Sequence, residues 1–177
     1  MVDSLTPVGY GNLSQGDVSM RLQTDLFEIR AFPLQEGILR LLKPDTYNSF
    51  HSLMVRKEDE IQQTADRWGV RAPMLFLVTF FGRQREARFQ PDILLITSQN
   101  RVFRPLQIFP LSPQWNQNQL SQRETQTAIY MYPDGIRLQD AIELSYDRFA
   151  TGAWAAIIRV LDSEWNSVQA RAARDRP

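Results

Sequence analysis

The side chains that most often carry out catalysis are scarce in this chain. Its only histidine is His51, in the segment Ser49-Phe50-His51-Ser52. A serine hydrolase needs a serine, a base and an orienting acid that meet in space, and serines beside the histidine on one predicted helix do not supply that arrangement. We therefore expect His51 to be a half-exposed helical residue, and we predict no catalytic residue.

The chain contains no cysteine, which excludes disulfides, thiol nucleophiles and cysteine-based zinc or iron–sulfur sites. A single histidine leaves any metal site to carboxylates, and no cluster of Asp and Glu has the spacing of a calcium loop. The 8 glycines form neither a phosphate-binding loop nor a dinucleotide fingerprint. We expect no metal and no cofactor.

Carboxylates remain candidates for acid–base chemistry, because such a pair must be close in space and not in sequence. Glu124, Asp140 and Glu143 are the visible candidates, although solvated positions at strand edges or in turns explain them equally well. An enzyme or small-ligand binder that uses scattered carboxylates is therefore the alternative function.

The charge balance argues against nucleic acid as a partner. The 177 residues include 20 basic and 20 acidic side chains, whereas nucleic-acid binding needs a clustered excess of Lys and Arg. Arg alternates with aromatic residues in segments 80–89 and 101–104. This pattern is typical either of single-stranded nucleic-acid binding or of a β-hairpin with Arg on its solvent face. The zero net charge and the strand periodicity favour the hairpin.

Arginine supplies nearly all of the positive charge, since only Lys43 and Lys57 are lysines. This bias indicates either a GC-rich genome or a contact surface, because guanidinium groups suit interfaces. A Pro-rich loop carries Trp115, which either folds back onto the core or anchors a partner. The candidate interface residues are Trp115, Arg101, Arg104 and Trp165.

Strand patterns dominate the middle of the chain. Residues 73–81 are a nearly continuous apolar run with the length of a strand that is buried on both faces. A hairpin or strand over 18–29 precedes them, with a bend near Thr24-Asp25. The other predicted strands, separated by turn residues, cover 93–97, 102–109, 125–132 and 142–146. The expected core is Leu75, Leu77, Phe80, Ile93, Leu95, Ile108, Ile129, Tyr130 and Leu144.

Two segments have helical periodicity. The first predicts a helix near 46–67, with a break in the charged run 56–60 as the alternative. The second predicts a C-terminal helix over about 153–173, with a strand over 154–160 and a shorter helix as the alternative.

The chain length suits one hydrophobic core. Residues 1–17 are rich in Gly, Ser, Pro and Asn, so we expect a flexible or loosely docked N-terminal arm. We expect residues 18–177 to form a single domain. Its predicted class is mainly β: an antiparallel sandwich of about seven strands, with an inserted helical segment and a C-terminal helix.

Two segments in the second half of the chain have the order of a predicted strand, a turn and a later strand. They are Ile93-Leu-Leu-Ile-Thr-Ser-Gln-Asn-Arg-Val-Phe-Arg-Pro105 and Arg123-Glu-Thr-Gln-Thr-Ala-Ile-Tyr-Met-Tyr-Pro-Asp-Gly-Ile136. Over residues 70–150 this order resembles the bacterial immunoglobulin-like or telokin-like β-sandwich domains of accessory proteins. The resemblance implies a sandwich without an active site, and both predicted helices depart from it.

These observations favour a non-catalytic accessory or scaffold subunit that binds other protein chains. No run of about eighteen apolar residues predicts a membrane span. The segment Met1 to Ser14 lacks the basic and apolar regions of a signal peptide. We expect either a mature extracytoplasmic form or a protein at the rim of a membrane assembly, in preference to a free cytoplasmic protein.

Overall fold

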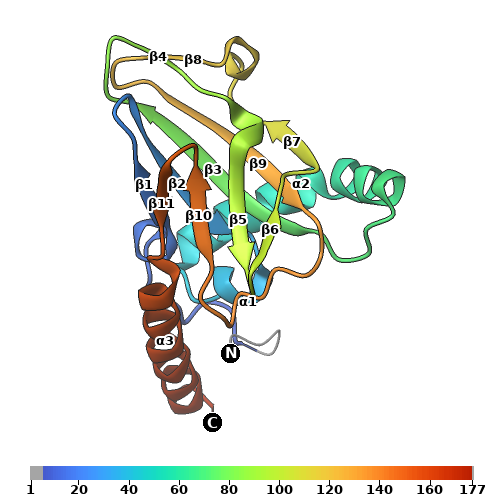
Figure 1. Ribbon diagram of the computed structural model, residues 1–177. Helices are drawn as coiled ribbons and strands as arrows, with labels where there is room; N and C mark the ends of the chain where they lie inside the picture. Colours follow the sequence, from blue (N-terminus) through green and yellow to red (C-terminus); the bar gives the residue numbers. More distant parts are fainter. Residues whose placement is uncertain (1–5, 177) are drawn as a thin grey trace.

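The computed structural model describes residues 6–176, in which antiparallel strands form two larger sheets and one small sheet (Figure 1). The five-stranded sheet has the order β1 (Met20–Gln23), β2 (Phe27–Pro33), β3 (Met74–Gly82), β9 (Thr125–Tyr132) and β7 (Gln107–Pro110). The four-stranded sheet has the order β11 (Phe149–Thr151), β10 (Glu143–Tyr146), β5 (Leu94–Ser98) and β6 (Arg101–Phe103). The small sheet pairs β4 (Glu86–Arg88) with β8 (Gln119–Ser121).

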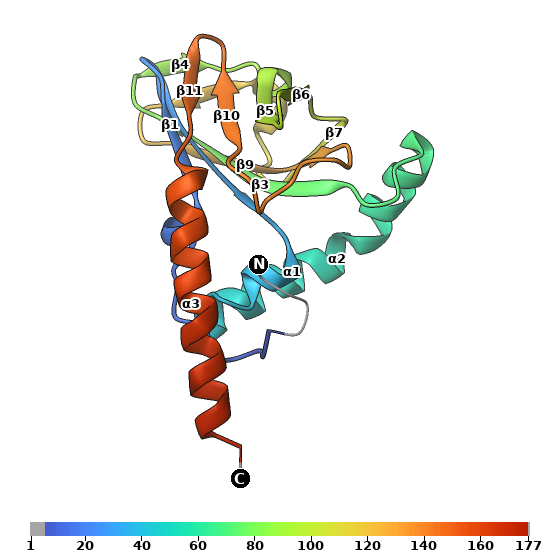
Figure 2. The ribbon, with the colours of Figure 1, turned by 60° about the horizontal axis from the view of Figure 1, so that its bottom comes forward.

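In the described part of the chain, three helices pack around the five-stranded sheet. They are α1 (Glu36–Leu39), α2 (Pro44–Trp68) and α3 (Trp154–Arg174). Figure 2 shows the four-stranded sheet on one side of the five-stranded sheet and α1 and α2 on the opposite side. Short 3-10 turns are η1 (Gln15–Val18), η2 (Pro91–Ile93) and η3 (Trp115–Gln117).

Alternation along the central strands gives the five-stranded sheet two different faces. Phe80 of β3 points toward the four-stranded sheet, where its ring lies 6.3 Å from that of Tyr146. Leu77 pairs with Phe32 of β2 and points the other way. Phe32 contacts Phe50 of α2 with ring centroids 5.1 Å apart, so this second face packs against the first half of α2.

A cluster of aromatic residues, called the aromatic core below, fills the space between the two larger sheets. Its members are Phe27, Phe80, Phe89, Trp115, Tyr130, Tyr132 and Tyr146. Each deeply buried hydroxyl has a partner: Tyr132 donates to the Leu94 carbonyl at 2.8 Å and Tyr130 to that of Pro91 at 2.7 Å. Burial raises the pKa of both tyrosines well above the usual value, so both hydroxyls stay protonated donors.

The N-terminal segment is held against α3. The Glu164 carboxylate accepts hydrogen bonds from the Asn12 amide at 2.9 Å and from Arg171 at 2.7 Å. Arg171 also donates to the Tyr10 carbonyl at 2.6 Å. Gly11 lies so close to the Leu41 backbone that a Cβ atom would clash with it. Residues 6–17 of the predicted arm are therefore docked, and residues 1–5 lie outside the described part of the chain.

The coarse prediction of antiparallel sheets with an inserted helix and a C-terminal helix is confirmed. The description "mainly β" was too narrow, because helices contribute about as many residues as strands. The predicted helix over 46–67 is continuous through the charged run, and it ends at Gly69, which has the left-handed φ of 69°. The alternative strand over 154–160 is wrong, since α3 begins at Trp154.

Two strand predictions failed in detail. The segment 102–109 forms two strands of different sheets, β6 and β7, because the chain crosses between the sheets near Pro105. In β5 the buried positions are Leu94 and Ile96, whereas the predicted core residue Leu95 is half-buried. A shift of one residue in phase moves every side chain of a strand to the other face. The other half-buried members of the predicted core are Leu75, Ile93 and Ile108.

Candidate interaction surface

Trp115 belongs to the interior of the molecule. The turn η3 places its indole 5.1 Å from the ring of Phe89 and 5.7 Å from that of Phe80, and only 4% of the residue is exposed. Of the two alternatives for this residue, the structure therefore has the fold-back onto the core. Trp115 cannot anchor a partner without opening that core.

Arg101 and Arg104 lie together at the edge of the four-stranded sheet. Both are exposed on or just after β6, with Val102 between them 61% exposed. The guanidinium of Arg101 stacks over the Phe103 ring at 5.1 Å. Trp165 lies on α3, half-buried, so the structure does not join the four predicted interface residues into one surface.

His51 takes part in a hydrogen-bonded cluster that joins α1 to α2. Glu36 accepts from the Tyr47 hydroxyl at 2.6 Å and from Arg40 at 3.0 Å. His51 Nδ1 lies 3.3 Å from the Tyr47 oxygen and 3.5 Å from Glu36. Burial tends to raise the pKa of Glu36, but the hydrogen bonds from Tyr47 and Arg40 overcome it and lower the pKa. Ser49 donates to the Asp45 carbonyl and is not a hydrogen-bond partner of His51, and the cluster links α1 to α2 through Glu36.

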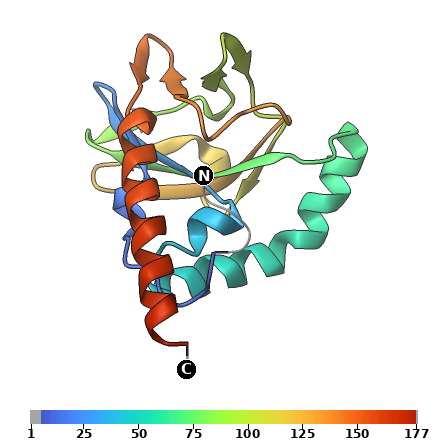
Figure 3. The same ribbon diagram turned by 90° about the horizontal axis from the view of Figure 1, so that it is seen from below.

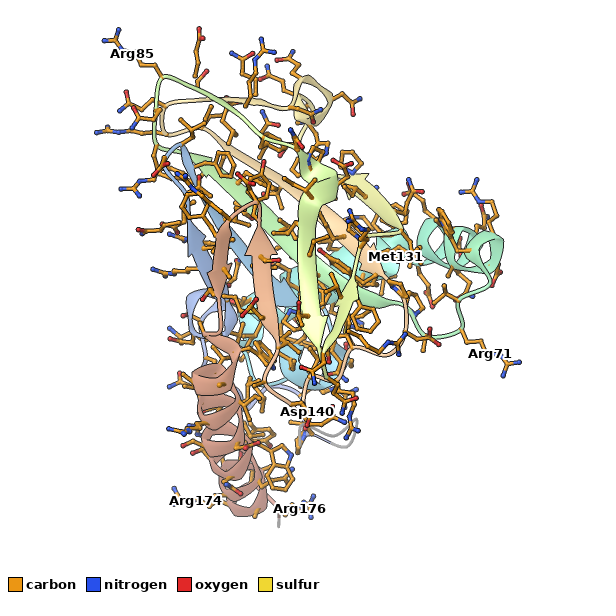
Figure 4. The ribbon with its side chains drawn as sticks, viewed as in Figure 1. Arg71, Arg85, Met131, Asp140, Arg174 and Arg176 are labelled. Atoms are coloured by element: carbon orange, nitrogen blue, oxygen red, sulfur yellow. The ribbon has the colours of Figure 1, made fainter. Side chains whose placement is uncertain are left out.

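Of the three predicted carboxylate candidates, Glu124 lies far from Asp140, and Glu143 is exposed at the start of β10. Glu124 accepts from the Ser121 amide at 2.7 Å in the turn between β8 and β9, and that bond lowers its pKa. Asp140 lies in the connection between β9 and β10, where it pairs with Arg137 at 3.2 Å. Figure 4 labels Asp140 at the opposite end of the molecule from Arg85, which lies near the β8–β9 turn. Glu124 therefore cannot share acid–base work with Asp140 in this arrangement.

A small apolar hollow lies where α1, the β9–β10 connection and α3 meet. Its buried walls are Ile38, Leu138, Trp154 and Leu161. The volume is about 170 Å³, below the roughly 300–1,000 Å³ of most small-molecule sites. The Trp154 N–H already donates to the Leu138 carbonyl at 2.8 Å. The polar side chains that also line the hollow are Gln35, Gln139 and Asp162.

Two shallow, open hollows follow one side of α2. The stripe of residues along them consists of His51, Val55, Glu58, Gln62 and Asp66, which share a helix face because they recur every three or four residues. The two hollows have volumes of about 370 and 390 Å³ and share Gln62. We call this feature the α2 groove.

Apolar side chains form the floor of the α2 groove in the hollow nearer α1, whereas the other hollow is lined mainly by polar groups. Ile61 is 7% exposed and Met54 is half-buried, whereas Val55 is 58% exposed at the side. Glu58 and Asp66 are exposed and form no ion pair within the described residues. The groove therefore combines an apolar floor with carboxylates that are open to a partner.

The second half of α2 extends past the edge of the sheet that its first half covers (Figures 1 and 3). Trp68 continues, at helical spacing, the stripe of Phe50 and Ile61 that faces the protein interior. It is nevertheless 53% exposed. The sequence pattern predicts that Trp68 is packed against the protein interior. The tertiary structure shows that α2 continues past the sheet, so Trp68 is left exposed.

No protein-family model matches this chain, and no curated protein or solved structure matches it. Within residues 6–176, no three histidine or acidic side chains gather so that they could hold a metal ion. Among the same residues, no helix combines the length and apolar character needed to cross a membrane. A functional assignment therefore depends on the chemistry of the surfaces described above.

Proposed function

We propose that this protein is a non-catalytic accessory or scaffold subunit that binds another protein chain through the α2 groove and the overhanging end of α2. The observation that carries the proposal is the exposed Val55 beside an apolar floor on a helix face that the protein's own sheets leave uncovered. Trp68 at the end of the same helix supports it, because tryptophan is enriched among the residues that dominate binding energy.

The proposal includes the finer expectations from the sequence. Two sheets on either side of the aromatic core support a sandwich of the immunoglobulin-like kind. A location outside the cytoplasm or at the rim of a membrane assembly is part of the same proposal. Partner identification from membrane and soluble fractions of the source cells tests that location.

The function is tested by substituting the exposed valine of the groove. The protein is isolated from its source under native conditions with Val55→Arg, and co-purifying chains are compared with those of the wild type. The matched control is Val160→Arg, which alters an exposed valine on α3. We expect the partner to be lost with Val55→Arg and kept with Val160→Arg. Equal retention by both variants would contradict the proposal.

The alternative function, small-ligand binding, is supported by the hollow beneath α3. Its volume of about 170 Å³ is near that of an apolar cavity known to hold a benzene-sized ligand. Thermal-shift measurements with benzene-sized aromatic compounds test this alternative. A rise in melting temperature that Leu138→Trp abolishes by filling the hollow would favour it over the scaffold function.

A further inference from the structure

We propose that the segment bound by the α2 groove is a basic amphipathic helix, with large apolar residues on one face and Lys or Arg beside them. This inference rests on the proposed function, because it assigns a partner chemistry to the same surface.

The charge of the groove selects a basic partner. Glu58 and Asp66 lie two turns apart on the stripe, and no Lys or Arg of the stripe lies between them. Gln62 donates to Asp66 at 2.9 Å without neutralising it. The pair Lys57–Glu60, at 3.2 Å, leaves Glu58 unpaired.

The two ends of the groove carry the remaining charges. At the α1 end, Glu36 is paired with Arg40 and faces His51. At the other end Arg71 lines the hollow that contains Asp66. In the middle of the groove, Glu58 has no cationic partner among residues 6–176, so the charge there is negative. Phosphates of nucleic acid and anionic lipid surfaces carry the same sign and would be repelled there.

The floor of the groove selects a large apolar side chain. Val55 and Met54 border it, and Ile61 lies below. Covering these atoms removes apolar surface from water, with a gain of roughly 25 cal/mol per Å². A basic segment without an apolar face would leave these apolar side chains in contact with water.

The backbone of α2 selects a helical partner. In the middle of an α-helix every N–H and C=O group is already hydrogen-bonded within the helix, so the groove offers a partner only side chains. The backbone groups of an extended segment that face the apolar floor would lose water without gaining a hydrogen-bond partner. A helix satisfies its own backbone groups, and helix-in-groove recognition reads apolar anchors at a spacing of three and four residues. The sixteen-residue stretch from His51 to Asp66 is about 22 Å long, or roughly four turns.

The experiment uses a fluorescently labelled peptide of eighteen residues, built only of Leu and Lys in helical periodicity. A second peptide has Glu in place of every Lys. Binding to the full-length protein is measured by fluorescence anisotropy at low and high salt. We expect the Leu/Lys peptide to bind and the Leu/Glu peptide not to bind. The affinity should fall as salt rises, because ions screen exposed charges.

The double variant Glu58→Gln/Asp66→Asn should weaken binding of the Leu/Lys peptide at least tenfold. The matched control Glu86→Gln/Glu143→Gln alters the same number of exposed carboxylates on β4 and β10 and should change it less than twofold. Far-UV circular dichroism and melting temperature confirm that both variants fold. Equal binding of both peptides, or equal weakening by both variants, would overturn the inference.

The two proposals can fail separately. If Val55→Arg abolishes co-purification of the native partner while the Leu/Lys peptide does not bind, the basic-helix inference is wrong and the scaffold function stands. If Val55→Arg keeps the native partner, the scaffold function is wrong at this surface, and the inference falls with it.

Discussion

The aromatic core and the α2 groove are built from similar ingredients and reach opposite outcomes. In the aromatic core the hydroxyls of Tyr130 and Tyr132 each find a carbonyl partner, and the rings are covered from both sides. In the α2 groove the carboxylates of Glu58 and Asp66 form no ion pair within the part of the chain that the structure describes, and Val55 is exposed. A surface that a protein needs only for its own stability is expected to be closed and hydrogen-bonded. The groove is open, and its carboxylates lack ion pairs within the described residues, which is why we propose binding there.

The largest loss of stability should come from Phe80→Ala in the aromatic core. Phe80 stacks on Phe89 at 4.4 Å and meets Phe27 at 5.5 Å, so truncation leaves a cavity in the aromatic core. We expect a loss of about 3–5 kcal/mol in the free energy of unfolding, measured by urea denaturation. Phe81→Ala is the control, because its half-buried ring lies on the other face of β3. A comparable loss for both variants would show that the core is not concentrated between the sheets.

A smaller loss is expected from Tyr132→Phe, which leaves the buried Leu94 carbonyl without its donor. We expect about 1–2 kcal/mol. The folded-state pKa of Tyr132 is raised by burial, so its contribution is present below the unfolded pKa near 10 and is lost as the pH rises above it. Tyr132→Phe should therefore make unfolding less sensitive to pH between about 9 and 11. If Tyr132→Phe left the pH dependence of unfolding between about 9 and 11 unchanged, the Tyr132 hydroxyl would not be buried as described.

Much of the sheet region could be predicted because local pattern and tertiary environment agree there. The predicted strand 125–132 matches β9, and the apolar run 73–81 matches β3 within one residue at each end. The face of β5 could not be predicted, because the 3-10 turn η2 before it fixes which residues point inward.

The candidate site was less predictable than the fold. The spacing of residues on α2 indicates a packed stripe, but it contains no information on where the neighbouring sheet ends. The exposure of Trp68 and Val55 depends on that end. Similarly, Trp115 had two alternatives from the sequence, and only the position of η3 beside Phe89 decides between them.

A weaker effect is expected at the α1 end of the groove from Glu36→Gln. The pKa of Glu36 is lowered in the folded state, so its contribution is present above the unfolded carboxyl pKa of about 4.3 and is lost as the pH falls. The side chain is 39% exposed, and solvent screening should keep the effect at pH 7 below about 1 kcal/mol. Melting temperatures at pH 7 and 3.5 should differ less in Glu36→Gln than in wild type. Glu58→Gln, which removes an exposed carboxylate outside this cluster, is the control.

The smallest change in stability is expected from Trp68→Ala. Because 53% of the residue is exposed, its removal should alter the free energy of unfolding by less than about 0.5 kcal/mol, as surface substitutions usually do. The same variant should weaken partner capture, measured alongside Val55→Arg. A loss of stability comparable to that of Phe80→Ala would place Trp68 in the core and remove it from the interface.

The pairing of β3 with β9 also bears on how the chain folds. Thr79 and Thr127 meet across these strands at 3.2 Å but are 48 residues apart in the sequence. Closing a loop of that length costs chain entropy before any contact compensates it, so folding should be slower than for proteins with mostly local contacts. The hairpin of β1 and β2 and the two long helices can form earlier, because their contacts are local. Until β9 arrives, the most apolar strand of the protein has an unpaired edge, and chain concentration during that interval should govern how much protein is lost to aggregation.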